Sequence, residues 1–187
     1  DAGHGTPDEG AQSSKGTTEA ETNLKIALKV QNLLEQSGCT VILTRSDEKA
    51  IYDLDKTTLK EKKISDIRNR VKIGNSASAD IFVSIHLNKI PQQQYWGWQC
   101  FYSKSEESMK LAKILQSSLN DAIQKDNKRV AMKLDTVYIM KHVEIPISIV
   151  ECGFLSNPEE EQQLLDDEYQ DKLAWGIYNG IIEYFTK

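Results

Sequence analysis

The stretch "ADIFVSIHLN", residues 79–88, is an almost continuous apolar run with an imidazole near its end. Short runs rich in β-branched and aromatic residues are typical of strands covered on both faces, so this segment predicts an α/β fold with a parallel sheet. His86 lies at the end of the expected strand. It is either a buried neutral histidine with one hydrogen bond or a metal ligand, and the choice depends on which residues can reach its ring.

Helices and strands alternate along the rest of the chain. Apolar residues at helical spacing predict helices at about 19–37, 64–80, 103–123, 158–165 and 173–184. Stretches rich in β-branched and aromatic residues predict strands at 39–45, 80–87, 97–102, 136–140 and 147–153. This alternation, with no linker or repeat, predicts a single domain over residues 1–187, built as a three-layer α/β sandwich with helices on both faces of a mostly parallel sheet.

Three local features refine this pattern. Ser103 and Glu106 have the spacing of a capping box at the start of the third helix. The aromatic residues of 97–102 fit a strand or the lining of a surface groove. Residues 46–60 are expected to form a polar insertion, and 124–135 a loop.

Composition excludes several classes of function. The chain has 187 residues, 39% of them hydrophobic, and a formal charge of -5 without a long block of either sign. This charge distribution contains no basic patch of the kind that binds nucleic acid or anionic lipid. No apolar run approaches the roughly 18 residues of a membrane span. Three widely spaced cysteines indicate neither a zinc ribbon nor a disulfide framework.

Four polar residues are placed to meet at one edge of the predicted sheet. His86 and Glu151 end strands, and His4 lies between two glycines. Glu19 opens the first helix and faces the same edge if the loop before it folds back over the sheet. Ligands usually bind at the carboxyl ends of strands in open α/β sheets. Two histidines and a carboxylate are a ligand set of catalytic zinc, and a further carboxylate supplies a base. Their spacing matches no local metal motif, so residue types alone leave the metal site open.

Six blocks of the sequence carry a family resemblance: "DAGHG", "EAETNLKIAL", "TRSD", "RVKIGN", "ADIFVSIHLN" and "IVECGFLSN". In order and approximate spacing, they resemble the zinc-dependent N-acetylmuramoyl-L-alanine amidases of bacterial cell walls. The resemblance covers essentially the whole chain and implies a zinc-exopeptidase-like fold. It implies that Zn²⁺ is held by His4, Glu19 and His86, and that Glu151 is the catalytic acid and base.

The resemblance also implies a substrate and a location. The substrate would be the amide bond between N-acetylmuramic acid and L-alanine in peptidoglycan, with an accessory activator protein as a further partner. "GWQCFY", residues 97–102, is similar to the spore-cortex members of the family. We therefore expect an exported protein of the cell wall or spore envelope, whose export segment is absent from this chain.

The sequence also departs from the family pattern. Ala2 and Thr6 stand where the family usually has proline and glycine, so the loop after His4 is expected to differ in shape. The chain begins where the family's first strand ends, and we expect that strand to begin upstream of Asp1.

Two other functions compete with the amidase. A non-catalytic binding module would have lost a ligand or the base, whereas all four positions are present. A glycosidase using two carboxylates would leave both histidines unexplained and would survive chelation. Arg45 and Arg70 match family blocks and are expected to be structural, with substrate binding or an ion pair to Glu151 as alternatives. His142 falls outside the ligand set.

Overall fold

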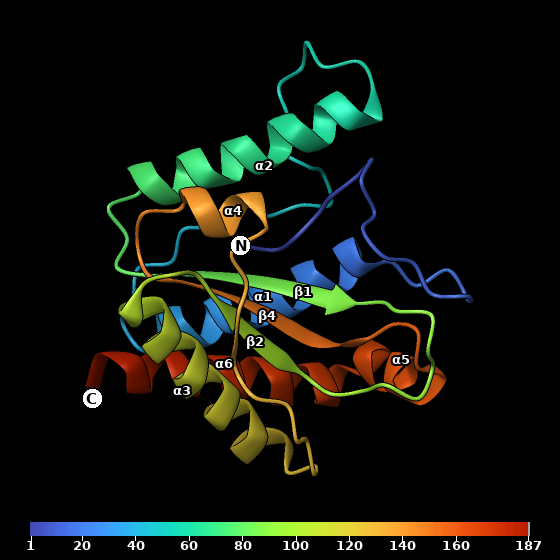
Figure 1. Cartoon of the computed structure of the whole chain (residues 1–187), viewed down its shortest axis with the longest axis vertical. Coiled ribbons are helices and arrows are strands. Elements are labelled where there is room, and N and C mark those ends of the chain that lie inside the picture. The colour runs from blue at the N-terminus through green and yellow to red at the C-terminus, as the bar shows by residue number, and fades with distance from the viewer. Residues whose placement is uncertain (187) are drawn as a thin grey trace.

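The computed structural model describes residues 1–186, which contain an open sheet of four strands (Figure 1). In order across the sheet, the strands are β1 (Phe82–Asn88), β4 (Ile147–Phe154), β2 (Gln99–Tyr102) and β3 (Met132–Lys133). β4 runs parallel to β1 and antiparallel to β2, and β3 runs parallel to β2. The sheet is therefore mixed, and the predicted α/β class is confirmed.

Helices cover both faces of this sheet, as Figure 1 shows. One face carries α1 (Glu19–Gln36), α3 (Glu106–Ile123), α5 (Pro158–Leu165) and α6 (Asp167–Thr186). The other face carries α2 (Leu59–Ser76) and α4 (Tyr138–His142). A larger hydrophobic core lies under the first set of helices and a smaller one under α2 and α4.

Strand alternation decides where His86 points, because successive side chains of a strand face opposite sides of the sheet. Ile85 is buried in the larger core, so His86 faces the α2 side. In β4, Val150 is buried in the larger core and Glu151 faces the α2 side in the same way. The parallel register pairs His86 directly with Glu151. Two of the predicted site residues are therefore neighbours across the sheet.

Residues 1–3 run along the outer edge of β1. The amide of Gly3 donates to the carbonyl of Ile85 at 3.0 Å, and the amide of Ile85 donates to the carbonyl of Asp1 at 2.8 Å. This pairing carries His4 towards the end of β1. The strand expected upstream of Asp1 stays a prediction. So does the single domain, whose last residue, Lys187, lies outside the described residues.

The starts of α2 and α3 differ from the predicted ones because of their caps, and α6 begins at Asp167, before the predicted residue 173. α2 begins at Leu59, earlier than predicted, because Thr58 and Glu61 form a capping box there. The predicted capping pair of α3 is wrong. Ser105 is its N-cap, and the Ser105 hydroxyl accepts from the amide of Ser108 at 3.1 Å. Ser103 instead donates its hydroxyl to that of Ser108.

The strand predicted at 136–140 is wrong, because α4 occupies most of this segment. Ile139 and Met140 are both buried in the smaller core. Adjacent residues of a strand would face opposite sides, whereas neighbours on a helical turn can share a buried side. Packing against α2 and the sheet therefore overrides the strand preference of Val137 and Ile139.

The strand predicted at 39–45 is also wrong. Within residues 1–186, no backbone hydrogen bond joins residues 40–44 to another segment, and Ile42 is 51% exposed. β-branched residues favour a strand only where a neighbouring strand supplies hydrogen-bond partners and a surface to pack on. The remaining predicted strands, at 80–87, 97–102 and 147–153, are confirmed as β1, β2 and β4.

Candidate active site

Glu19 lies in the first turn of α1, where the partial positive charge of the helix terminus favours a carboxylate. Its side chain is almost fully buried. The amide of Ala11 donates to Oε2 at 2.7 Å, and the amide of Leu87 donates to Oε1 at 3.2 Å. Glu19 therefore joins the loop before α1 to the end of β1, as the sequence predicted if that loop folds back.

His4 is held at both its backbone and its ring. Its φ is 61°, a left-handed conformation that is uncommon for a residue with a Cβ. Arg70 donates to its carbonyl at 2.5 Å, and its Nδ1 lies 3.0 Å from Oδ2 of Asp8. Its Nε2 faces Glu19 Oε2 at 3.4 Å. Asp8, which Lys63 contacts at 2.8 Å, thus orients the ring so that Nε2 points into the cluster.

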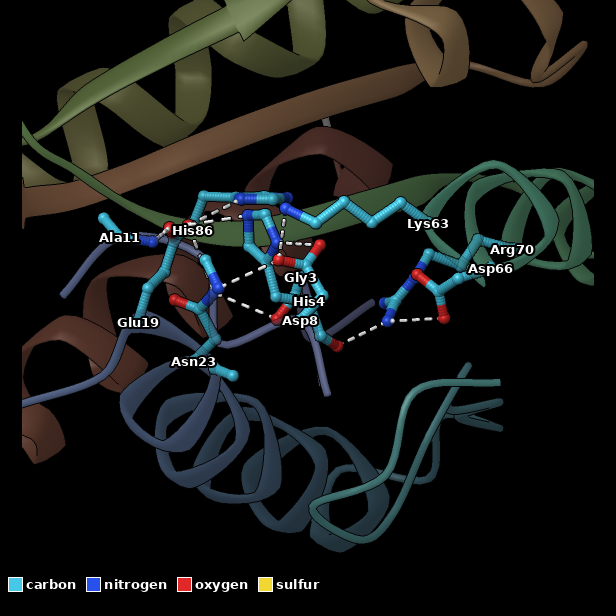
Figure 2. Close-up of polar contacts among 12 residues, drawn as sticks. Gly3, His4, Asp8, Ala11, Glu19, Asn23, Lys63, Asp66, Arg70 and His86 are labelled. Atoms are coloured by element: carbon cyan, nitrogen blue, oxygen red, sulfur yellow. Dashed lines mark hydrogen bonds and ion pairs between the residues drawn. The ribbon is translucent and has the colours of Figure 1, made fainter. Parts of the chain in front are cut away.

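His86 completes a three-residue cluster, shown in Figure 2. Its Nδ1 lies 2.8 Å from Glu19 Oε1, and its ring meets that of His4 edge to face at a centroid distance of 5.2 Å. One donor atom from each of His4, Glu19 and His86 lies within 4.8 Å of the other two. The structure therefore brings together three of the predicted residues in an arrangement that could hold a metal ion.

Two glycines make room for this cluster. A Cβ on Gly3 would lie 2.3 Å from the His86 ring. A Cβ on Gly10 would lie 2.6 Å from Glu19 Oε2 and 2.7 Å from the His4 ring. Backbone thus packs directly against all three side chains of the cluster, and no larger residue fits at either position without moving them.

Glu19 is ionised across the physiological pH range. Burial opposes its negative charge, but the hydrogen bond from His86 and the charges of both histidines outweigh this, and the pKa of Glu19 is about 2. Burial likewise opposes ionisation of Asp8, yet its hydrogen bonds with His4 and Lys63 hold its pKa well below the usual range. The cluster therefore presents an anionic oxygen together with imidazole nitrogens.

Glu151 lies beside His86 on the neighbouring strand and has a different environment. Its Oε2 is inaccessible to solvent and has no hydrogen-bond partner among the described residues. Burial, reinforced by the negative charge of Glu19 and opposed by the two histidines, raises the pKa of Glu151 to about 7. The site thus holds one carboxylate that is firmly ionised and another that binds a proton far more readily.

Arg45 and Arg70 bind the protein itself. Arg45 donates to the carbonyls of Gly3 at 3.0 Å and Ala20 at 2.7 Å. Arg70 forms ion pairs with Asp1 and Asp66 at 2.6 and 2.7 Å. Neither forms an ion pair with Glu151 within residues 1–186. Both arginines therefore hold the segment that leads to His4.

The remaining candidate ligands lie elsewhere. His142 is exposed at the end of α4, where its ring stacks on that of Tyr138. All three cysteines are free, as the sequence predicted. Asp8 and Gly10 were missed as site residues. The one sequence signal for Asp8 is an acidic residue four positions after a histidine in a glycine-rich loop.

An α/β sheet with two histidines, an ionised glutamate and a second, protonatable glutamate at its edge is the arrangement of a metal-dependent hydrolase. The chain belongs to the N-acetylmuramoyl-L-alanine amidase family, whose model matches residues 1–183. Its activity is hydrolysis of the amide bond between N-acetylmuramic acid and L-alanine in peptidoglycan. The predicted family, activity and fold are therefore confirmed.

Individual relatives agree with this assignment. The germination-specific N-acetylmuramoyl-L-alanine amidase of Bacillus subtilis strain 168 is 39% identical, over 100% of this chain and 78% of the relative. The CwlD amidase of Clostridioides difficile, solved in complex with the GerS lipoprotein, superposes with a TM-score of 0.96 at 41% identity, over 99% of this chain and 95% of that one. The catalytic domain of CwlV from Bacillus (Paenibacillus) polymyxa var. colistinus gives a TM-score of 0.83 at 31% identity, over 99% and 95%.

Proposed function

We propose that the amidase activity of this chain depends on Zn²⁺ held by His4, Glu19 and His86, with Glu151 as the group that transfers protons. The observation that carries this proposal is Oε2 of Glu151, an inaccessible carboxylate oxygen without a partner, on the strand next to His86. A buried polar atom without a hydrogen-bond partner lowers the stability of the fold. Such atoms are found at functional sites, where the reaction uses the group.

The three side chains suit zinc in their chemistry, and one donor atom from each lies within 4.8 Å of the other two. Zinc bound by imidazole nitrogen and carboxylate oxygen at about 2.0–2.2 Å in a tetrahedron requires donor atoms about 3.3 Å apart. His4 Nε2 and Glu19 Oε2 are separated by 3.4 Å. Two neutral imidazoles and one carboxylate leave a net charge of about +1 on the cluster. When bound, Zn²⁺ acts as a Lewis acid that polarises the scissile carbonyl and favours deprotonation of water.

Glu151 would handle both proton transfers. Its carboxyl group accepts a proton from the water that attacks the muramoyl carbonyl, and a C–O bond forms at that carbon. The same group then delivers the proton to the alanine nitrogen as the C–N bond breaks. The products are a free lactyl carboxylate and a free L-alanine amino terminus. Proton transfer of this kind contributes roughly 10² to 10⁴ in rate.

The substrate proposed for this chain is spore peptidoglycan. This rests on the relative from Bacillus subtilis, which is named germination-specific, and on the likeness to CwlD. Such a substrate lies outside the cytoplasmic membrane, so we place the action of the chain in the cell wall or spore envelope. None of the helices in residues 1–186 is long and apolar enough to cross a bilayer.

An accessory protein is a further part of the proposal. The solved CwlD amidase is bound to the GerS lipoprotein. In the present chain His86 belongs to β1, whereas His4 and Glu19 lie at the two ends of the loop that leads into α1. A partner that fixes this loop would raise zinc occupancy. Zinc content and amide cleavage, measured for the purified chain with and without such a partner, should then rise together.

The decisive test is Glu151→Gln, which keeps the shape of the side chain and removes the base. We expect unchanged zinc content and no loss of melting temperature, with turnover reduced at least about a hundredfold. Turnover is measured as release of free L-alanine amino termini from peptidoglycan. Glu159→Gln, an exposed acid in α5, is the matched control and should behave like the unmodified chain. A stable, zinc-loaded Glu151→Gln protein with near-normal turnover would refute the assignment.

A further inference from the structure

The sheet places a third polar side chain next to Glu151. Gln99 of β2 is the direct cross-strand partner of Glu151, which in turn pairs with His86 on its other side. Residues directly opposite each other in a sheet share a face. With strands about 4.8 Å apart, Gln99 lies about 5 Å from Glu151 and about 10 Å from His86 along the sheet. Gln99 therefore marks the side of the site that faces away from the metal cluster.

Gln99 fixes the guanidinium of Arg129. Nη1 of Arg129 donates to Oε1 of Gln99 at 3.3 Å, and its Nε donates to the carbonyl of Trp96 at 3.1 Å. The guanidinium lies 4.6 Å from the centre of the Phe154 ring and 5.9 Å from that of Tyr95. Two hydrogen bonds and two aromatic rings thus hold this long side chain beside the site.

A bulge in β4 brings Phe154 to this position. The register with β1 shifts after His86, so that Phe154 pairs with Asn88 and shares the face of Glu151. Glu160 fixes the bulge, because its carboxylate accepts from the amides of Phe154 and Gly97, each at 2.8 Å. The platform under Arg129 is therefore built from a bulge and a loop that one buried carboxylate joins.

Arg129 has hydrogen-bonding capacity left over. Its two fixed contacts are with neutral oxygens, and it forms no ion pair with any acid in the described part of the chain. The neighbouring Lys128, by contrast, pairs with Asp126 at 2.5 Å. A guanidinium has five N–H donors in a planar fork that matches a carboxylate. Most of these donors remain available to a ligand.

We propose that Arg129 binds a carboxylate of the stem peptide, namely that of the residue that follows L-alanine. The proposal rests on the proposed function, in which the scissile amide lies over Glu151. A peptide spans about 3.3–3.6 Å per residue, so this carboxylate lies roughly 7 Å beyond the scissile bond. The path across the sheet is comparable, because Gln99 lies about 5 Å from Glu151 and Nη1 of Arg129 lies 3.3 Å beyond Oε1 of Gln99. Arg129 is thus a specificity residue for acidic stems.

The test compares two forms of peptidoglycan, one with free α-carboxylates on the D-glutamate that follows L-alanine and one in which they are amidated. The unmodified chain should cleave the free-acid form with a lower KM. Arg129→Gln should raise KM for that form about tenfold, keep kcat within about twofold, and leave the amidated form nearly unaffected. Arg129→Lys, which keeps the charge without the fork, should fall between them. Lys128→Gln, the adjacent cation, is the control and should change neither form.

Each other outcome is informative. If the unmodified chain cleaves both forms equally well, or if Arg129→Gln loses activity equally on both, Arg129 only supports its loop and the proposal is wrong. Melting temperatures measured on the same preparations identify a variant that has lost its fold. If Arg129→Gln is unfolded, the KM of Arg129→Lys for the two peptidoglycan forms tests the proposal instead. If the unmodified, zinc-loaded chain cleaves neither form, it is the proposed function itself that fails.

Discussion

His86 combines a structural and a chemical constraint in one residue. Its backbone belongs to β1, between two residues buried in the larger core, while its ring contacts Glu19 at 2.8 Å on the opposite face. The strand does not need the ring, because the neighbouring side chains supply the burial that stabilises it. The two roles can therefore be separated by mutation.

We expect His86→Ala to remove both metal and amidase activity while the chain keeps its fold. The alanine eliminates one of three donors but leaves the apolar side chains of β1 in place. Elemental analysis, circular dichroism and peptidoglycan cleavage measure the three properties. His142→Ala is the control, since His142 is exposed and remote from the cluster. Full zinc occupancy in His86→Ala would contradict the ligand assignment.

Glu151 makes the stability of the metal-free chain depend on pH. Its pKa is about 7 in the folded state, compared with 4.5 for an ordinary glutamate, so the folded chain binds the proton more tightly. This contribution to stability is fully present below pH 4.5 and is lost as the pH rises through about 7. It amounts to roughly 3 kcal/mol.

The comparison with Glu151→Gln isolates this effect. In urea unfolding of chelator-treated proteins between pH 4 and 8, the unmodified chain should lose free energy of unfolding relative to Glu151→Gln as the pH rises. Parallel curves over this range would show that the carboxyl group is not buried as the structure has it.

At the scale of elements, the loop of residues 5–18 shapes the cluster of His4, Glu19 and His86 from one side. Gly10, with φ of 67°, packs against Glu19 and His4, whereas Gly16, with φ of 95°, has open space around it. A side chain is unfavourable at both positions because of the backbone conformation, but only Gly10 contacts Glu19 and His4. Comparing alanine substitutions at Gly10 and Gly16 therefore distinguishes backbone strain in the loop from displacement of Glu19 and His4.

Gly10→Ala should weaken zinc binding by more than about tenfold and reduce activity in parallel, since its Cβ would displace a carboxylate oxygen and an imidazole. Gly16→Ala should cost only roughly 1 kcal/mol of stability and bind zinc normally. Competition with a zinc chelator of known affinity measures both. Equal losses in the two variants would mean that the loop acts through its flexibility alone.

How far the sequence predicted these elements depends on what each one packs against. β1 and β4 were predictable because burial on both faces leaves a continuous apolar run. Residues 136–140 have a similar composition but form α4, since only the packing of Ile139 and Met140 against α2 decides between helix and strand. Residues 39–45 lack a strand partner, which no local pattern reveals.

The same distinction applies to the site. His86 and Glu151 could be found as polar residues at strand ends, and the register then made them neighbours. The role of Asp8 depends on a loop conformation, and that of Arg129 depends on a bulge in β4 and on the loop between α3 and β3. Such contacts join segments without periodicity, so sequence patterns carried no signal for them.

For the whole molecule, the proposed metal site and the hydrophobic cores are separate sources of stability. Both cores consist of buried side chains other than His4, Glu19 and His86. We therefore expect exhaustive chelation to abolish amide cleavage while lowering the melting temperature by only a few degrees. Added zinc should restore activity. Cleavage that persists in a chain shown to be metal-free would instead favour hydrolysis by two carboxylates.

The order of the site residues along the chain has a consequence for synthesis. His4 and Glu19 leave the ribosome first, His86 follows Glu19 by 67 residues, and Glu151 comes after most of the domain. Contacts between such distant positions form late, after the loops between them have closed. A nascent or truncated chain therefore carries no complete hydrolytic centre. The candidate active site is therefore assembled only after Glu151 has left the ribosome.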